Sequence, residues 1–160
     1  PSRDAWSEVH VGSPTDNQIE TTGYGAVIGG RDHVFFSSEP ISVDEDELQF
    51  TGQTGLAAED EVHLFEGDAI MFEGFGLMRN GGDFGAGAWR TGEGAVEGRI
   101  VGREGGELSV ALPGSPQADT VEIRVAGEAI DATIDNGTVS FPVEISGMDG
   151  YKPFEIRWTP

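Results

Sequence analysis

The sequence predicts an all-β protein, an antiparallel β-sandwich or barrel with very little helix. Apolar and polar residues alternate with a period of two through most of the chain, which is typical of strands with one buried and one solvated face. Glycine- and proline-containing turns separate these runs. No window shows the periodicity of an amphipathic helix, and the apolar stretch at 56–58 amounts to one turn at best.

The clearest strands lie in the last third of the chain. A Pro-Gly-Ser-Pro turn at 113–116 ends the first of them, and Asn136-Gly137 separates two later runs. Asn-Gly between alternating runs is a strong hairpin signal because both residues tolerate positive φ. The strands predicted here span residues 108–112, 121–125, 130–134, 139–145 and 154–158.

The first hundred residues look β-rich but less regular. Acidic runs at 44–47 and 59–61 interrupt the alternation. Residues 74–106 contain 12 glycines. A long glycine-rich excursion within a compact domain is either functional or an interaction arm. The strands predicted in this region span residues 6–11, 25–28, 33–36, 48–51, 62–65, 69–72 and 96–101.

A glycine-rich segment at 102–106 is the candidate boundary between two regions. Residues 1–104 would form a β-rich N-terminal region that includes the glycine-rich arm at 74–106. The pattern of residues 107–160, a proline-bounded strand followed by hairpins with short polar turns, resembles a reduced immunoglobulin-like sandwich. Such a module usually needs ~100 residues. We therefore expect this segment to share its core with the N-terminal region or with a neighbouring subunit.

The charge of the chain is extreme. There are 29 acidic residues against nine basic ones, Lys152 is the only lysine, and the formal net charge is −20. Self-repulsion on this scale destabilises a compact state at low salt. At about 1 M ionic strength the Debye length falls to roughly 3 Å and screens it. This composition resembles proteins of haloarchaea and their viruses, which implies a protein adapted to molar salt.

The composition also excludes several classes of function. A surface this negative repels phosphate backbones, so we expect no nucleic-acid partner. No apolar run approaches the ~20 residues of a membrane span. The chain has no cysteine, so disulfides, thiolate metal sites and cysteine nucleophiles are unavailable.

The titratable residues nominate no catalytic, cofactor or metal site. His10, His33 and His63 are far apart and lack metal-ligand spacing, so we expect surface histidines that point outward. The acidic runs fit no EF-hand loop and indicate a hydrated surface that binds cations from brine loosely. Gly23-Tyr24-Gly25 resembles a dinucleotide fingerprint, but a predicted strand follows it where the fingerprint needs a helix.

An apolar cluster in the glycine-rich stretch suggests a subunit contact. Apolar residues on a flexible segment of a carboxylate-coated protein fit a docking arm. The other interpretation is that Phe65, Met71 and Phe72 form core strands, while the rest of the cluster packs over the sheet edge. Flanking arginines would pair with acidic neighbours across the contact. The predicted contact residues are Phe75, Leu77, Met78, Arg79, Phe84, Trp89 and Arg90.

These features favour a non-enzymatic structural subunit that contacts copies of itself and other structural subunits. The profile resembles virion proteins of haloarchaeal viruses, such as capsid, decoration, turret or tail proteins, and implies location in a virion.

Two other functions stay open. One is a carbohydrate-binding β-sandwich module at a haloarchaeal cell surface, with Trp6, Tyr24, Trp89 and Tyr151 to stack on sugar rings. The other is a halophilic enzyme whose histidines and carboxylates converge from distant strands.

Overall fold

The computed structural model describes residues 19–114, 116, 121–145 and 150–159. Within those ranges the chain forms β-strands and no helix. All strand pairs are antiparallel. The all-β fold class is thereby confirmed. The strands are β1 (Ile19–Thr22), β2 (Gly25–Ile28), β3 (Asp32–Glu45), β4 (Leu48–Ala58), β5 (Glu61–Phe72), β6 (Phe75–Asn80), β7 (Asp83–Gly92), β8 (Ala95–Glu104), β9 (Gly106–Ala111), β10 (Val121–Val125), β11 (Glu128–Ala129), β12 (Thr133–Asp135), β13 (Thr138–Val143) and β14 (Tyr151–Trp158).

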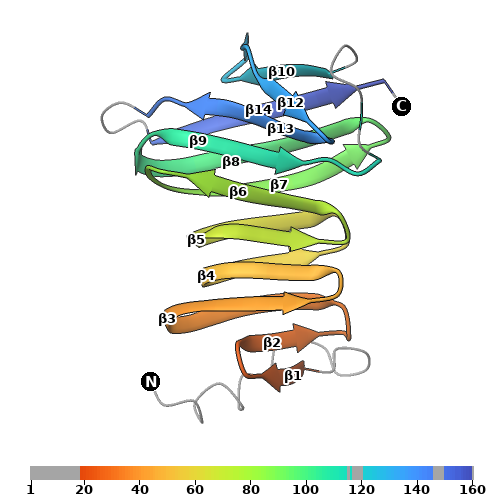
Figure 1. Cartoon of the computed structure of the whole chain (residues 1–160), viewed down its shortest axis with the longest axis vertical. Helices are drawn as coiled ribbons and strands as arrows, with labels where there is room; N and C mark the ends of the chain where they lie inside the picture. Colours follow the sequence, from red (N-terminus) through yellow and green to blue (C-terminus); the bar gives the residue numbers. More distant parts are fainter. Residues whose placement is uncertain (1–18, 115, 117–120, 146–149, 160) are drawn as a thin grey trace.

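The fold is one sheet that bends over and then divides into two layers (Figure 1). Strands β3, β4 and β5 are long, and each passes through both layers. Residues 61–64 of β5 pair with β7, whereas residues 69–72 pair with β6. One layer continues as β7-β8-β14-β10-β11 and the other as β6-β9-β13-β12. We call these the β8 layer and the β9 layer.

Glycines allow the bend in β4 and β5. The register between these strands shifts around Gly52, where a Cβ atom would lie 2.5 Å from the Glu66 carbonyl oxygen. A Cβ atom on Gly67 would lie 2.5 Å from the Thr51 carbonyl oxygen and 2.8 Å from the Gly52 Cα. The two backbones are therefore too close for a side chain at either position, and only glycine lets the strands cross between layers.

A single hydrophobic core runs between the layers from β3 to β14. At the lower end Phe35 stacks on Phe50, with ring centroids 4.1 Å apart. At the upper end Phe141 meets Phe154 at 5.6 Å. Strand β8 pairs with β14 and β6 pairs with β9, so strand pairing crosses the predicted boundary at 104–107. The immunoglobulin-like character of residues 107–160 stays a prediction.

Most of the predicted strands lie within observed ones. The runs at 62–65 and 69–72 are two halves of β5, and the run at 130–134 contributes only its last two residues to β12. Strands β1, β6, β7 and β11 were not predicted. The predicted strand at 6–11 lies outside the described residues.

The glycine-rich segment at 74–106 is not a projecting arm. It forms the hairpin strands β6, β7 and β8 and the start of β9. Several of its glycines lie at close approaches to neighbouring residues: a Cβ atom on Gly98 would lie 2.1 Å from the Phe154 ring. The density of glycine there reflects tight packing, so the expectation of an arm is corrected.

Candidate functional site

Four large apolar side chains remain exposed among the described residues: two on β8 and β14 of the β8 layer, and two on β3 and β5, which pass through both layers. Their exposed fractions are 50% for Phe36, 53% for Phe65, 54% for Val101 and 58% for Tyr151. Their strand neighbours Phe35, Leu64 and Ile100 are fully or almost fully buried. Because successive side chains of a strand point to opposite faces, the exposed residues point away from the core.

The strand register brings these residues onto one outer face. Val101 pairs directly with Tyr151 on one side and with Gly85 on the other. A Cβ atom on Gly85 would lie 3.3 Å from the Phe65 Cα, so Phe65 is its neighbour in β5. Side chains of directly opposed residues emerge on the same face. We call Phe65, Val101 and Tyr151 the apolar row.

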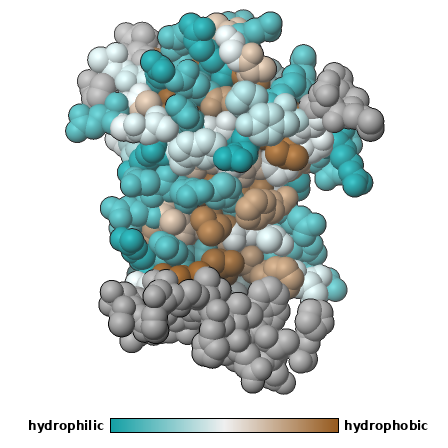
Figure 2. Space-filling view, turned by 180° about the vertical axis from the view of Figure 1, so that it is seen from behind, coloured by the Kyte–Doolittle hydropathy of each residue, from teal (hydrophilic) through white to brown (hydrophobic). Residues whose placement is uncertain are grey.

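The apolar row belongs to a larger apolar strip. His63 stacks on Phe65 with ring centroids 5.5 Å apart, and its ring covers Gly87. His63 also contacts the Glu61 carboxylate, and its side chain is only 17% exposed. Figure 2, which views the molecule from the side opposite to Figure 1, shows brown apolar residues over its middle between teal polar ones. This is the least polar surface that the view presents.

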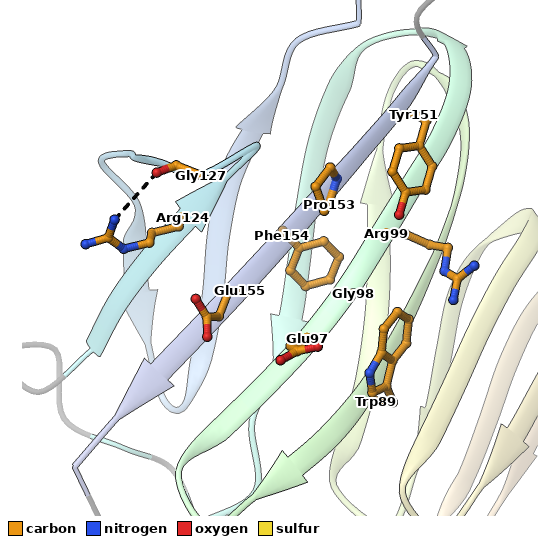
Figure 3. A pocket seen from close by; sticks show the side chains of 10 residues that line it. All are labelled: Trp89, Glu97, Gly98, Arg99, Arg124, Gly127, Tyr151, Pro153, Phe154 and Glu155. Carbon is orange, nitrogen blue, oxygen red and sulfur yellow. Dashed lines mark hydrogen bonds between the residues drawn. The ribbon is translucent and has the colours of Figure 1, made fainter.

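The upper end of this face holds a hollow of about 400 Å³ (Figure 3). Strand β7 contributes Trp89, and β8 contributes Glu97 and Arg99. Tyr151 and Glu155 come from β14. The remaining lining residues are Gly98, Arg124, Gly127, Pro153 and Phe154.

Ion pairs and a cation–π contact fix several of the lining side chains. The Arg99 guanidinium lies 4.9 Å from the centre of the Trp89 ring. Arg157 binds Glu155 at 2.5 Å. Arg124 donates to Glu122 at 2.7 Å and to the Gly127 carbonyl oxygen at 3.5 Å.

Glu97 differs from the other charged residues of the hollow. It stands directly opposite Glu155 in the register of β8 and β14, and like charges placed so are destabilising. Among the described residues Glu97 has no ion-pair partner within 4.0 Å. Its carboxylate is thus an unused acceptor in the hollow.

Three of the seven predicted contact residues are core residues of the chain itself. Phe75 and Leu77 are completely buried, and Phe84 is 3% exposed. Each stands on the inward phase of β6 or β7. The prediction that they contact another subunit through an arm is wrong for this folded state because their surface is already used inside the monomer.

The two predicted arginines pair within the chain. Arg79 binds Asp68 at 3.3 Å, donates to the Phe84 carbonyl oxygen at 2.9 Å and lies 5.9 Å from the centre of that ring. Arg90 lies 5.2 Å from the centre of the Phe75 ring and 3.7 Å from Asp60. Both guanidinium groups therefore cover buried aromatic rings at the edge of the core.

Met78 and Trp89 are half-buried, and they lie in different layers. Met78 pairs with Ser109 in the β9 layer, whereas Trp89 pairs with Glu97 in the β8 layer. Whether either of them contacts another subunit stays a prediction.

The two described histidines do not come together. His63 lies on the outer face of β5, as predicted. His33 is a correction: it pairs with the buried Ala57 and faces the interior, where its ring lies 5.4 Å from that of Phe72. Its Nδ1 is buried without a hydrogen-bond partner. Burial lowers the pKa of His33, against an opposing influence of Glu45 and Asp32. His10 lies outside the described residues.

The aromatic residues considered for sugar binding are partly brought together. Trp89 and Tyr151 line the same hollow, which their separation in sequence did not reveal. Tyr24 instead stacks on Phe35 at 5.4 Å, and its hydroxyl donates to Glu45 at 3.4 Å. Burial raises the pKa of Tyr24. Trp6 lies outside the described residues.

Sequence reasoning missed the apolar row, although a signal was present. Val62 and Leu64 occupy inward positions of their strand, and Phe65 is the next, outward one. Val96 and Ile100 are likewise inward, and Val101 is outward. Large apolar residues on the outward phase of an amphipathic strand predict an exposed apolar face.

Comparisons with protein families, with curated proteins and with solved structures find no match. Among the described residues no three metal-ligating side chains gather in one place. The same part of the chain contains no helix of the length and apolarity that crossing a membrane requires.

Proposed function

We propose that the chain is a non-enzymatic structural subunit of an assembly adapted to molar salt, namely a virion protein of a haloarchaeal virus such as a capsid, decoration, turret or tail protein. The observation that carries this proposal is the apolar row on one outer face of a chain whose formal charge is −20. In this role the chain would act by geometry, contacting copies of itself and neighbouring structural subunits. A haloarchaeal cell surface is the other location that fits.

The apolar row is the part of the surface best suited to contact between copies. Two chains of equal negative charge repel each other wherever their carboxylates meet. A face that presents Phe65, Val101 and Tyr151 presents no carboxylate at those positions. Two such faces stack about 10 Å apart, with their side chains interdigitated. Burial of a phenylalanine side chain contributes roughly 1.5–3 kcal/mol.

High salt makes this contact favourable for two reasons. At about 1 M ionic strength the Debye length is roughly 3 Å, so carboxylates at the margin of the contact repel weakly. Salts that are excluded from the protein surface also strengthen burial of apolar groups. Assembly should therefore increase with salt concentration, whereas a contact formed by ion pairs would weaken.

Sedimentation velocity in molar KCl tests the proposal with matched variants. The wild type should sediment as a multimer, and the variant Phe65→Ser/Val101→Ser should sediment as a folded monomer. The control Met71→Ser removes apolar surface from a half-buried position in the part of β5 that pairs with β6. It should retain the multimer. A monomeric wild type at all concentrations and salt levels would contradict the proposal.

A further inference from the structure

We propose that the hollow between Trp89, Arg99 and Tyr151 is a binding site for a neutral oligosaccharide. This site goes beyond the structural role, because that role requires contact between copies and no small ligand. Its volume of about 400 Å³ is that of a small-molecule site. It lies open on the outer face of β7, β8 and β14, so a chain of sugar units enters without any movement of the backbone (Figure 3).

Two aromatic side chains of the hollow reach its surface: Tyr151 is 58% exposed, whereas Trp89 is half-buried and carries the Arg99 guanidinium over one face of its ring. Trp89 pairs with Glu97 and Tyr151 pairs with Val101, so both rings are placed relative to β8. Their Cα atoms lie two strand spacings apart across the sheet and four residues apart along the strands, which places these Cα atoms roughly 16 Å from each other. This distance suits a short oligosaccharide rather than one sugar. The negative face of an aromatic ring attracts the C–H-bearing face of a sugar.

The polar groups of the hollow match hydroxyl groups better than ions. Its lining contains two glutamates, Glu97 and Glu155, and two arginines, Arg99 and Arg124. Their formal charges cancel, although the chain as a whole carries −20. An anion would meet the carboxylates and the field of the whole protein, and a cation would meet the arginines. A neutral ligand rich in hydroxyl groups satisfies donors and acceptors together.

Glu97 is the polar residue on which the proposed binding depends most. It stands opposite Glu155 in the register of β8 and β14 and has no ion-pair partner among the residues that the structure describes. A hydrogen bond from a neutral hydroxyl to a carboxylate is stronger than one between neutral groups. Sugar hydroxyls that donate to Glu97 and Glu155 would relieve the repulsion without introducing charge. Arg99, held over Trp89, offers donors beside the same ring.

The test measures binding of neutral tetrasaccharides of glucose, mannose and N-acetylglucosamine, and of a sulfated tetrasaccharide, by calorimetry and by tryptophan fluorescence. Because Tyr151 also belongs to the apolar row, binding is measured in molar KCl at a protein concentration at which the wild type is monomeric. At least one neutral tetrasaccharide should bind to the wild type. Trp89→Ala should weaken that binding at least tenfold, and Glu97→Gln should weaken it several-fold while preserving shape. The control Glu107→Gln, in the β9 layer, should bind as the wild type does.

Four results would overturn the site. One is that none of these saccharides binds, and another is that both hollow variants bind as tightly as the wild type. The third is that only a sulfated tetrasaccharide binds. If Trp89→Ala instead converts the multimer to a monomer and leaves saccharide binding unchanged, the hollow is a contact between copies and the proposal fails. Because Phe65→Ser/Val101→Ser leaves Trp89 and Glu97 in place, loss of assembly in that variant leaves the saccharide test valid.

Discussion

The two layers share one core but present different outer faces. The outer face of the β8 layer carries Phe65, Val101 and Tyr151. The corresponding face of the β9 layer carries Ser109 and Ser140, whose hydroxyls lie 2.7 Å apart. Because inward and outward positions alternate along a strand, the core constrains only half of the residues. The outward half is free to differ, and there the two layers carry different side chains.

Glycine adds to this difference between the faces. In the β8 layer, Gly85 lies between Phe65 and Val101 across β7, and the His63 ring covers Gly87, which pairs with Arg99. Two successive outward positions of β7 without side chains leave a shallow channel between its neighbours. The outer face of the β8 layer is therefore flat enough to pack against the same face of another copy. On the outer face of the β9 layer, the Ser109 and Ser140 hydroxyls instead form a hydrogen bond with each other.

The core beneath both faces should be the most sensitive part of the molecule. Phe50 is completely buried and stacks on Phe35. Phe50→Ala should lower the free energy of unfolding by about 3–5 kcal/mol, since it leaves a cavity between the layers. Denaturant unfolding in molar KCl measures this change. A loss below about 1 kcal/mol would mean that the layers are not packed on a common core at this point.

The bend that holds the two faces back to back depends on Gly67. The variant Gly67→Ala places a Cβ atom 2.5 Å from the Thr51 carbonyl oxygen, where only backbone is available to move. It should destabilise the fold by about 1–3 kcal/mol, measured in the same unfolding experiment. Gly23→Ala is the matched control because a Cβ atom there meets nothing within 4 Å. Equal stability of the two variants would contradict the bend.

The outer face of the β9 layer should contribute to the stability of the monomer and not to the association of copies. Ser140→Ala removes the hydrogen bond to Ser109 and should lower the free energy of unfolding by about 0.5–1.5 kcal/mol. Sedimentation in molar KCl should be unchanged. Dissociation of the multimer by this substitution would show that copies meet through the β9 layer.

The smallest effect is a pH dependence from His33, which is half-buried and faces the core. Its pKa is lowered in the folded state by burial, so the unfolded chain, with a histidine pKa of about 6.5, binds the proton more readily. Stability contributed by neutral His33 is present above about pH 6.5 and is lost as the pH falls through the unfolded value toward the folded one. The unfolding midpoint of the wild type should fall relative to that of His33→Gln as the pH falls below about 6.5. Parallel curves would contradict the assignment.

The alternation of residues predicted where strands lie and which residues form the core. It could not predict the bend of β3, β4 and β5, because this depends on close approach between Gly52 and Gly67 of different strands. The glycine-rich segment was misinterpreted for a related reason: Gly98 looks flexible in sequence, but it provides space for the Phe154 ring. Local patterns do not report such contacts between distant residues.

The hollow was equally inaccessible to sequence reasoning. Trp89 and Tyr151 are far apart along the chain and meet only because β8 pairs with both β7 and β14. The apolar row was accessible in principle, since Phe65 and Val101 occupy outward positions. The apolar residues that are most concentrated in sequence are a different set, and several of these are buried.

Cysteine labelling tests most directly whether copies contact each other through the outer face of the β8 layer. The chain has no cysteine, so Val101→Cys and Thr133→Cys each introduce a single thiol, on the β8 and β9 layers respectively. Maleimide should label both variants quickly in dilute monomer. In the multimer formed in molar KCl, labelling at position 101 should slow at least tenfold while labelling at position 133 stays fast. Fast labelling at 101 with protection at 133 would contradict the account.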